Sequence, residues 1–200
     1  LRGAVNALQE NVSQQIELPQ GYRIEYGGQF KSEAKASRLL MITAVLAVLV
    51  IYLLLYFEFR SLKLAGIVLL NLPLALIGGI IIVKLTSGVI SIASTIGFIS
   101  LLGIATRNGI LLISRYLTLE QEGKKGDQLI IHGAGDRLNP IIMTALTTTL
   151  ALIPLALKGG QPGNEIQSPM AVVILGGLIS ATILNMIVIP SVYKIKKKKR

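Results

Sequence analysis

The stretch "GFISLLGIATRNGILLISRYL", residues 97–117, places an arginine and an asparagine inside a run of apolar and small residues. This run covers about 89–113, which at about 1.5 Å per residue is long enough to cross a hydrocarbon core of about 30 Å. The run offers no carboxylate to Arg107. Because an unpaired charge is costly inside a bilayer, the stretch predicts a membrane helix whose charge is compensated from elsewhere.

The composition supports a membrane protein along the whole chain. Of the 200 residues, 52% are hydrophobic and 15% charged, and the mean hydropathy of +0.66 is too high for a soluble domain of this size. The apolar residues form long blocks, which predicts an all-α membrane protein. The five predicted transmembrane helices cover approximately 39–57, 64–85, 89–113, 140–157 and 170–192.

Basic residues predict the orientation of these spans. One set of loops carries twelve Lys and Arg, whereas the opposite short loops carry only Lys84 and Lys158. The richer side is expected to be cytoplasmic, with a basic tail at 193–200. The net charge of +10 therefore indicates membrane topology and no nucleic-acid partner. The twelve residues are Arg60, Lys63, Arg115, Lys124, Lys125, Arg137, Lys194, Lys196, Lys197, Lys198, Lys199 and Arg200.

The first 35 residues are more polar and have a different pattern. Apolar residues spaced three or four apart over 1–16 predict an amphipathic helix, and alternation over 22–26 predicts a strand. One helix and one strand cannot bury a core alone. We therefore interpret 1–35 as the αβ end of a larger periplasmic domain, followed by a transmembrane domain over 36–200.

The loop before the fourth span is expected to form an interfacial helix over about 118–136, because a charged start is followed by an apolar patch. His132 in this loop is interpreted as a solvated side chain, and Glu165 as a residue of an outer loop. The glycine pairs 78–79 and 176–177 predict close helix contacts. No Cys, metal-ligand set or nucleophile–base pair is present, which argues against an enzyme, a metal site or a cofactor.

Two spans carry a polar face. Ser100, Gly103, Arg107 and Ser114 share one side of the third span, and Thr144, Thr147 and Thr148 share one side of the fourth. Counted from the cytoplasmic ends of these runs, Arg107 and Thr144 lie at matching depth, about 7–9 Å inside the boundary. Arg107 either bends toward the cytoplasmic interface or pairs with carboxylates that another part of a larger assembly supplies.

Six motifs occur in order: "YGGQF" (26–30), "FRS" (59–61), "NLPLALIGG" (71–79), the 97–117 stretch, "RLNPIIMTALTTTLALIPLAL" (137–157) and "GNEIQSPMAVVILGGLISATILNMIVIPSVY" (163–193). Together they resemble the carboxyl-terminal part of a resistance–nodulation–division (RND) efflux permease, closest to the heavy-metal branch of cobalt–zinc–cadmium and copper–silver pumps. The resemblance covers essentially the whole chain. It implies spans eight to twelve of a twelve-span inner-membrane transporter.

The resemblance also implies roles for single residues. Family members exchange protons for substrate through acidic residues on the fourth span, which here would lie in a missing amino-terminal half. Arg107 matches the tenth-span position that faces those acids, with Asn108 following it. Thr144 matches the eleventh-span threonine, and Arg137 a basic position at the cytoplasmic start of that span. A homotrimer, a periplasmic adaptor and an outer-membrane channel are the implied partners, beside the lipid bilayer.

The expected function is therefore proton-driven export of heavy-metal cations. Two alternatives stay open at this point. One is an RND exporter of drugs or other small molecules, and the other is a truncated membrane module that does not transport anything.

Overall fold

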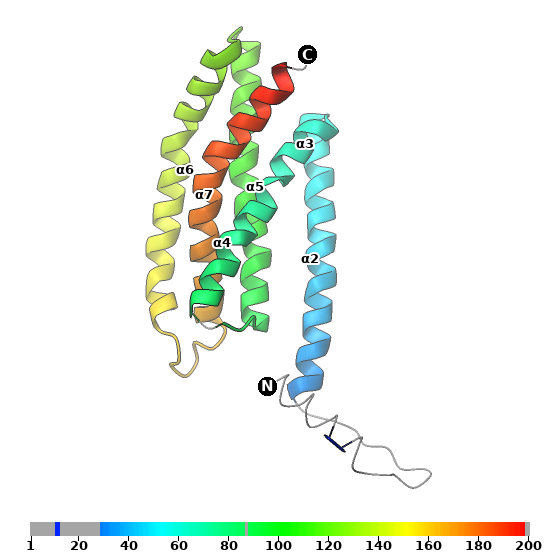
Figure 1. Cartoon of the computed structure of the whole chain (residues 1–200), viewed down its shortest axis with the longest axis vertical. Coiled ribbons are helices and arrows are strands. Elements are labelled where there is room, and N and C mark those ends of the chain that lie inside the picture. Colours follow the sequence, from blue (N-terminus) through cyan, green and yellow to red (C-terminus); the bar gives the residue numbers. More distant parts are fainter. Residues whose placement is uncertain (1–10, 13–28, 87, 199–200) are drawn as a thin grey trace, which may run out of the picture. The chain divides into compact units, whose positions relative to one another are not determined.

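The computed structural model describes residues 11–12, 29–86 and 88–198, and this part of the chain is helical apart from turns and short loops. The chain divides into two compact units, 1–42 and 43–200, and the packing below concerns the second unit. The helix over 1–16 and the strand over 22–26 fall almost wholly outside the described residues and stay predictions. The elements, drawn in Figure 1, are α2 (Gln29–Phe59), α3 (Leu62–Leu69), α4 (Asn71–Thr86), α5 (Ile92–Gln121), α6 (Gly126–Leu157) and α7 (Gln167–Lys198).

The described residues contain five helical segments that are long and apolar enough to cross a membrane, which confirms the expected number. Four of the segments contain the corresponding predicted runs, whereas the third begins at Ile92, three residues after the start of the predicted run 89–113, and ends eight residues beyond it. The segments are Lys35–Phe59, Leu62–Thr86, Ile92–Gln121, Gly126–Leu157 and Gln167–Ile195.

The second segment consists of two helices, α3 and α4, which meet at a turn at Leu70. Pro73 lies in the first turn of α4, where its missing N–H is tolerated. In one uninterrupted helix, Pro73 would leave the Leu69 carbonyl without its i→i+4 donor and its ring would clash with that carbonyl. The proline thus accounts for the position of the break.

A sharp corner joins α2 to α3. Arg60 has a φ of 46°, the one non-glycine residue with positive φ in the described part of the chain. Its N–H donates to the Tyr56 carbonyl at 2.8 Å, and the Ser61 hydroxyl accepts from the Leu64 N–H at 3.4 Å. These two bonds end α2 and begin α3 within two residues.

The region expected to form a separate interfacial helix over about 118–136 has a different structure. Residues 118–121 continue α5, a short turn follows, and residues 126–136 are the first turns of α6, continuous with the fourth span. The reason is the position of Leu129, which packs fully buried in one cluster with Tyr116 and Leu119 of α5. Part of the apolar patch is thus covered by a neighbouring helix instead of lying on a membrane surface.

Helix α7 is the centre of the packing, because it contacts α4, α5 and α6 along much of its length (Figure 1). Glycines permit the close approach, as predicted. A methyl group at Gly78 would collide with the Gly176 carbonyl and Ser180, and one at Gly177 would collide with Leu101. The Ser180 hydroxyl lies 3.3 Å from the Leu74 carbonyl, within hydrogen-bonding distance across the same contact.

Large parts of α2 and α6 are not covered by the described residues. Within the second unit, α2 buries only Leu55, and α6 buries only Leu129, Gly133 and Ile141. Exposed side chains on both helices are mostly large and apolar, such as Leu46, Phe57, Met143 and Leu150. Such surfaces fit a hydrocarbon environment or further helices.

The glycine contact at α4–α7 gives a stability prediction. Gly78→Ala should destabilise the bundle by about 1–3 kcal/mol, because its methyl group meets a backbone carbonyl that cannot move cheaply. Gly66→Ala is the matched control: nothing lies within 4 Å of its added carbon, and alanine favours the helix. Unfolding in mixed detergent micelles, followed by circular dichroism, measures both. Equal stability of the two variants would contradict the close packing.

Candidate functional site

Arg107 lies on a side of α5 that the described residues leave uncovered. Ser100, Gly103 and Arg107 are all exposed, whereas Leu101, Ala105 and Leu112 on the opposite side are fully buried. The Ser100 hydroxyl donates to the Ile96 carbonyl of its own helix at 3.0 Å. The predicted polar face of the third span therefore exists as a face, and it is free to receive another element.

No counter-ion for Arg107 occurs among the residues that the structure describes. Its guanidinium makes no ion pair or hydrogen bond within them. The carboxylates of α5, α6 and the turn between them lie toward the end of the hairpin where these helices join, at positions 120, 122, 127 and 136. A compensating charge has to come from outside this group of helices, and its source stays a prediction.

Thr144 lies at the level of Arg107. The antiparallel helices α5 and α6 are joined by an ion pair in which the Arg115 Nη2 lies 2.7 Å from Asp136 Oδ2. Eight residues back from Arg115 along α5 is Arg107, and eight residues on from Asp136 along α6 is Thr144. Both steps cover about 12 Å along the helix axes, which puts the two residues at about one level along the hairpin.

The hydroxyl of Thr144 is partly satisfied within α6. It donates to the Pro140 carbonyl at 2.8 Å, and the residue is half-buried. Because this bond uses only the proton of the hydroxyl, its oxygen lone pairs remain able to accept a hydrogen bond from a guanidinium.

Arg137 lies closer to the joined end of α5 and α6 than Thr144 does. It is seven residues before Thr144 in α6, about 10 Å along the axis, and it lines an open hollow of about 460 Å³ together with Arg115 and Asp136. Its Nε atom is enclosed and has no hydrogen-bond partner in the described part of the protein. The structure thus associates Arg137 with the Arg115–Asp136 pair and not with Arg107.

Asn108 points away from the uncovered face. It is only 3% exposed, and it is rotated by about 100° from Arg107 around the helix. A methyl group added at the adjacent Gly109 would meet Val68, Asn71 and Ile189, which places this side of α5 against α3, α4 and α7. The structure therefore separates Asn108 from Arg107, although the two are neighbours in sequence.

Two further buried amides were not identified as site residues from the sequence. Asn71 is 1% exposed and its Nδ2 donates to the Ala105 carbonyl at 3.1 Å, while its Oδ1 has no partner among the described residues. Asn185 is fully buried, and both of its amide atoms lack partners in the same part of the chain. The sequence feature that could have identified them is a single asparagine within each of the apolar runs "NLPLAL" and "TILNMIV".

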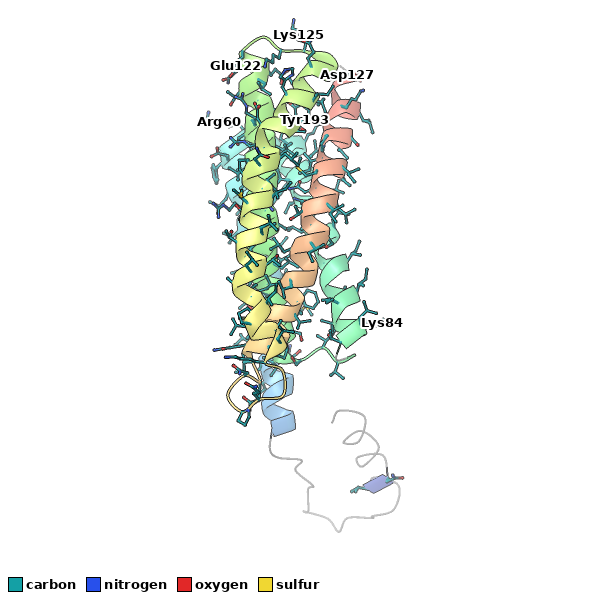
Figure 2. All side chains as sticks on the ribbon, turned by 90° about the vertical axis from the view of Figure 1, so that its left-hand side faces the viewer. Arg60, Lys84, Glu122, Lys125, Asp127 and Tyr193 are labelled. Carbon is teal, nitrogen blue, oxygen red and sulfur yellow. The ribbon has the colours of Figure 1, made fainter. Side chains whose placement is uncertain are left out.

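Polar contacts connect α5, α6 and α7 at the end that carries the α5–α6 turn. The Tyr193 hydroxyl donates to Glu120 Oε2 at 3.1 Å, and Lys194 Nζ lies 2.7 Å from Asp127 Oδ1. The rings of Tyr116 and Tyr193 pack with their centroids 4.9 Å apart. These contacts and the Arg115–Asp136 pair make the three helices one connected group at this end; Figure 2 labels Glu122, Lys125, Asp127 and Tyr193 there.

The remaining polar candidates do not form a metal centre. His132 is exposed, and its Nδ1 lies 2.8 Å from the Gln128 carbonyl of its own helix. Glu165 accepts a hydrogen bond from the Gly163 N–H at 3.1 Å and lines a cavity of about 420 Å³ at the opposite end of the bundle. Within the described ranges, no group of three His, Cys, Asp or Glu side chains is arranged to hold a metal ion.

Comparison with known proteins gives consistent matches over almost the whole chain. A sequence profile of the AcrB/AcrD/AcrF family matches residues 1–197. The nickel and cobalt resistance protein CnrA of Cupriavidus metallidurans is 38% identical over 189 residues, 94% of this chain and 18% of CnrA. The cobalt-zinc-cadmium resistance protein CzcA of the same organism is 35% identical over 188 residues, again 94% of this chain and 18% of the relative.

A solved structure is similar as well. The crystal structure of a heavy metal efflux pump superimposes with a TM-score of 0.84 at 30% identity, over 99% of this chain and 20% of that protein. The chain therefore spans about a fifth of the length of the relatives that it matches.

The unpaired amide of Asn185 gives a prediction about stability. Asn185→Leu should stabilise the bundle by about 1–3 kcal/mol, because it removes polar atoms that are buried without partners. Asn71→Leu should change stability less, since it removes one satisfied and one unsatisfied group. Unfolding in mixed micelles compares the two variants. A clear loss of stability in Asn185→Leu would show that this amide has a partner in the bilayer.

Proposed function

Because this chain belongs to the AcrB/AcrD/AcrF family, in the heavy-metal branch of the RND efflux permeases, we propose that it forms part of a proton-driven exporter of heavy-metal cations. The observation that carries the proposal is the exposed guanidinium of Arg107, on a polar helix face that the described residues leave open. The resistance proteins for nickel, cobalt, zinc and cadmium among its relatives favour metal cations over drugs as the substrate class.

The partner of Arg107 in this proposal is a carboxylate pair on a helix from another part of the transporter. Ser100 and Gly103 leave room for that helix to approach closely, because their side chains are small. Ionised carboxylates attract the guanidinium across the open face. When a proton from the outer side binds to them, the attraction weakens and the two helices separate or shift. Release of the proton to the inner side restores the pair.

Thr144 offers Arg107 a second position. Its oxygen lies at the level of Arg107 and retains acceptor capacity, since its own proton is used by the Pro140 carbonyl. We propose that the guanidinium bonds to Thr144 while the carboxylates are protonated. The arginine would then alternate between two acceptors instead of losing all hydrogen bonds in one half of the cycle.

The described contacts suggest how a shift of α5 is transmitted. Arg115 ties α5 to α6 through Asp136, and Tyr193 ties α7 to α5 through Glu120. Movement of α5 therefore carries α6 and α7 with it at this end. Arg137, beside the Arg115–Asp136 pair, belongs to this connection and is proposed to position α6, while Asn108 is proposed to hold α5 against its neighbours.

The wider setting is proposed from the resemblance and the charge distribution. The transporter would lie in the inner membrane with its basic α7 end in the cytoplasm and residues 1–35 in the periplasm. It would work as a homotrimer with a periplasmic adaptor and an outer-membrane channel. Because the described residues hold no metal-ligand group, the metal would bind to other parts of the transporter.

The role of Arg107 can be tested in the complete transporter. Arg107→Ala should lower metal export by at least about a hundredfold, because removal of one partner leaves carboxylates buried without compensation. Arg107→Lys keeps the charge and should retain part of the activity, and Lys84→Ala is a control at an exposed cation outside the open face. The measurement is metal uptake with coupled proton movement in inverted vesicles. Undiminished export in Arg107→Ala would refute the proposal.

Thr144 gives a second, smaller effect. Thr144→Val removes the acceptor but keeps the side-chain shape, and it should slow export by roughly tenfold or more, as expected for the loss of one hydrogen bond from a charged donor. Thr147→Val is a matched control, because Thr147 is exposed and its hydroxyl bonds within α6 in the same way. The measurement is the export rate of both variants at equal expression, and only Thr144→Val should be slower than the unmodified protein. Equal rates would remove Thr144 from the mechanism.

A further inference from the structure

The corner between α2 and α3 presents two positive charges that the described residues do not neutralise. Arg60 and Lys63 make no ion pair within the described ranges. Figure 2 shows Arg60 toward the end of the bundle that carries the α5–α6 turn, with Lys84 at the opposite end. We name Arg60 and Lys63 the basic corner.

Two other basic side chains in this half of the bundle, Arg115 and Lys194, are compensated within it. Arg115 is shared between Asp136, at 2.7 Å, and Glu122, at 3.3 Å. Lys194 pairs with Asp127. Glu122, Asp127 and Asp136 are thus taken up by these contacts. Glu58, exposed in the last turn of α2, makes no ion pair with Arg60 or Lys63 among the described residues. The basic corner therefore keeps its charge for a partner outside the bundle.

Exposed apolar side chains lie directly beside the basic corner. Phe57, three residues before Arg60, is 71% exposed, and Leu62, the first residue of α3, is 58% exposed. Cations next to uncovered apolar surface match the boundary between hydrocarbon and headgroups, where long basic side chains reach toward phosphates. A soluble anion would gain nothing from these apolar neighbours.

We propose that the basic corner binds the phosphate headgroup of an anionic phospholipid in the leaflet that it faces. Arg60 and Lys63 contact the phosphate, while Phe57 and Leu62 lie against the acyl chains. The Ser61 hydroxyl accepts a hydrogen bond from the Leu64 N–H and thereby stabilises the start of α3 at the corner. The site is a property of the membrane-embedded protein and does not depend on metal transport, so its test is independent of the test of export.

Because the backbone at position 60 is left-handed, the charge of Arg60 can be removed by a substitution that does not strain the corner. Glycine adopts a φ of 46° without strain, so Arg60→Gly deletes the guanidinium and suits the corner. Combined with Lys63→Gln, it gives a variant that has lost both cations. The matched control is Lys125→Gln, which removes a charge from the exposed α5–α6 turn.

The experiment is a titration of the purified transporter with phosphatidylglycerol and with phosphatidylcholine, followed by native mass spectrometry. The unmodified protein should prefer phosphatidylglycerol, and each charge lost from the corner should weaken its binding by roughly fivefold. Lys125→Gln should bind like the unmodified protein. Equal weakening in the control, or no preference for the anionic lipid, would overturn the proposal.

A competition arm separates the lipid from free phosphate. Inorganic phosphate at millimolar concentration should not displace phosphatidylglycerol, because it lacks the acyl chains that Phe57 and Leu62 contact. Full displacement would show a site for a soluble anion and would equally overturn the assignment to lipid. Circular dichroism of the double variant confirms that the helices are intact, so that weakened binding is attributed to the lost charges.

Discussion

The charge of Arg107, which no described residue compensates, is the constraint on which the rest of this structure depends. Helix α5 is otherwise an ordinary membrane-length helix, with one side buried against its neighbours. The guanidinium lies on the other side, among small and polar residues that offer it no anion. Inside a bilayer such a charge is stable only with a negative partner or with access to water. The open face of α5 therefore requires either an element that carries a negative charge or contact with water.

The packing around α7 holds α4, α5 and α7 together without any contact at the open face of α5. Gly78 and Gly176 bring α4 and α7 into backbone contact, and Gly177 receives Leu101 of α5. These contacts leave little freedom within the group. The polar contacts at the α5–α6 turn add a second attachment. A change in the environment of Arg107 is thus expected to displace several helices together.

Much of this arrangement could be predicted from the sequence, and the exceptions have physical reasons. Apolar runs gave the five spans, and helical spacing placed Ser100, Gly103 and Arg107 on one face. The same spacing would have separated Asn108 from Arg107, but their adjacency in sequence and in the family motif grouped them. The continuity of α6 was not predicted, because an apolar patch does not show whether it meets lipid or, as for Leu129, another helix. The amides of Asn71 and Asn185 could be seen in the sequence, but their burial depends on packing that only three dimensions reveal.

The short connection between α5 and α6 has a consequence for biogenesis. An arginine within a span raises the cost of transferring a single helix from the translocon into lipid, by about 2.5–3.5 kcal/mol when it lies at the centre of the helix. Arg115 and Asp136 are only 21 residues apart in sequence, so their contact between α5 and α6 needs no other part of the chain. A helical hairpin can then partition as one body, with Thr144 of α6 at about the level of the arginine. The contacts that hold α5 and α6 together in the finished bundle thus also favour their integration into the membrane as a pair.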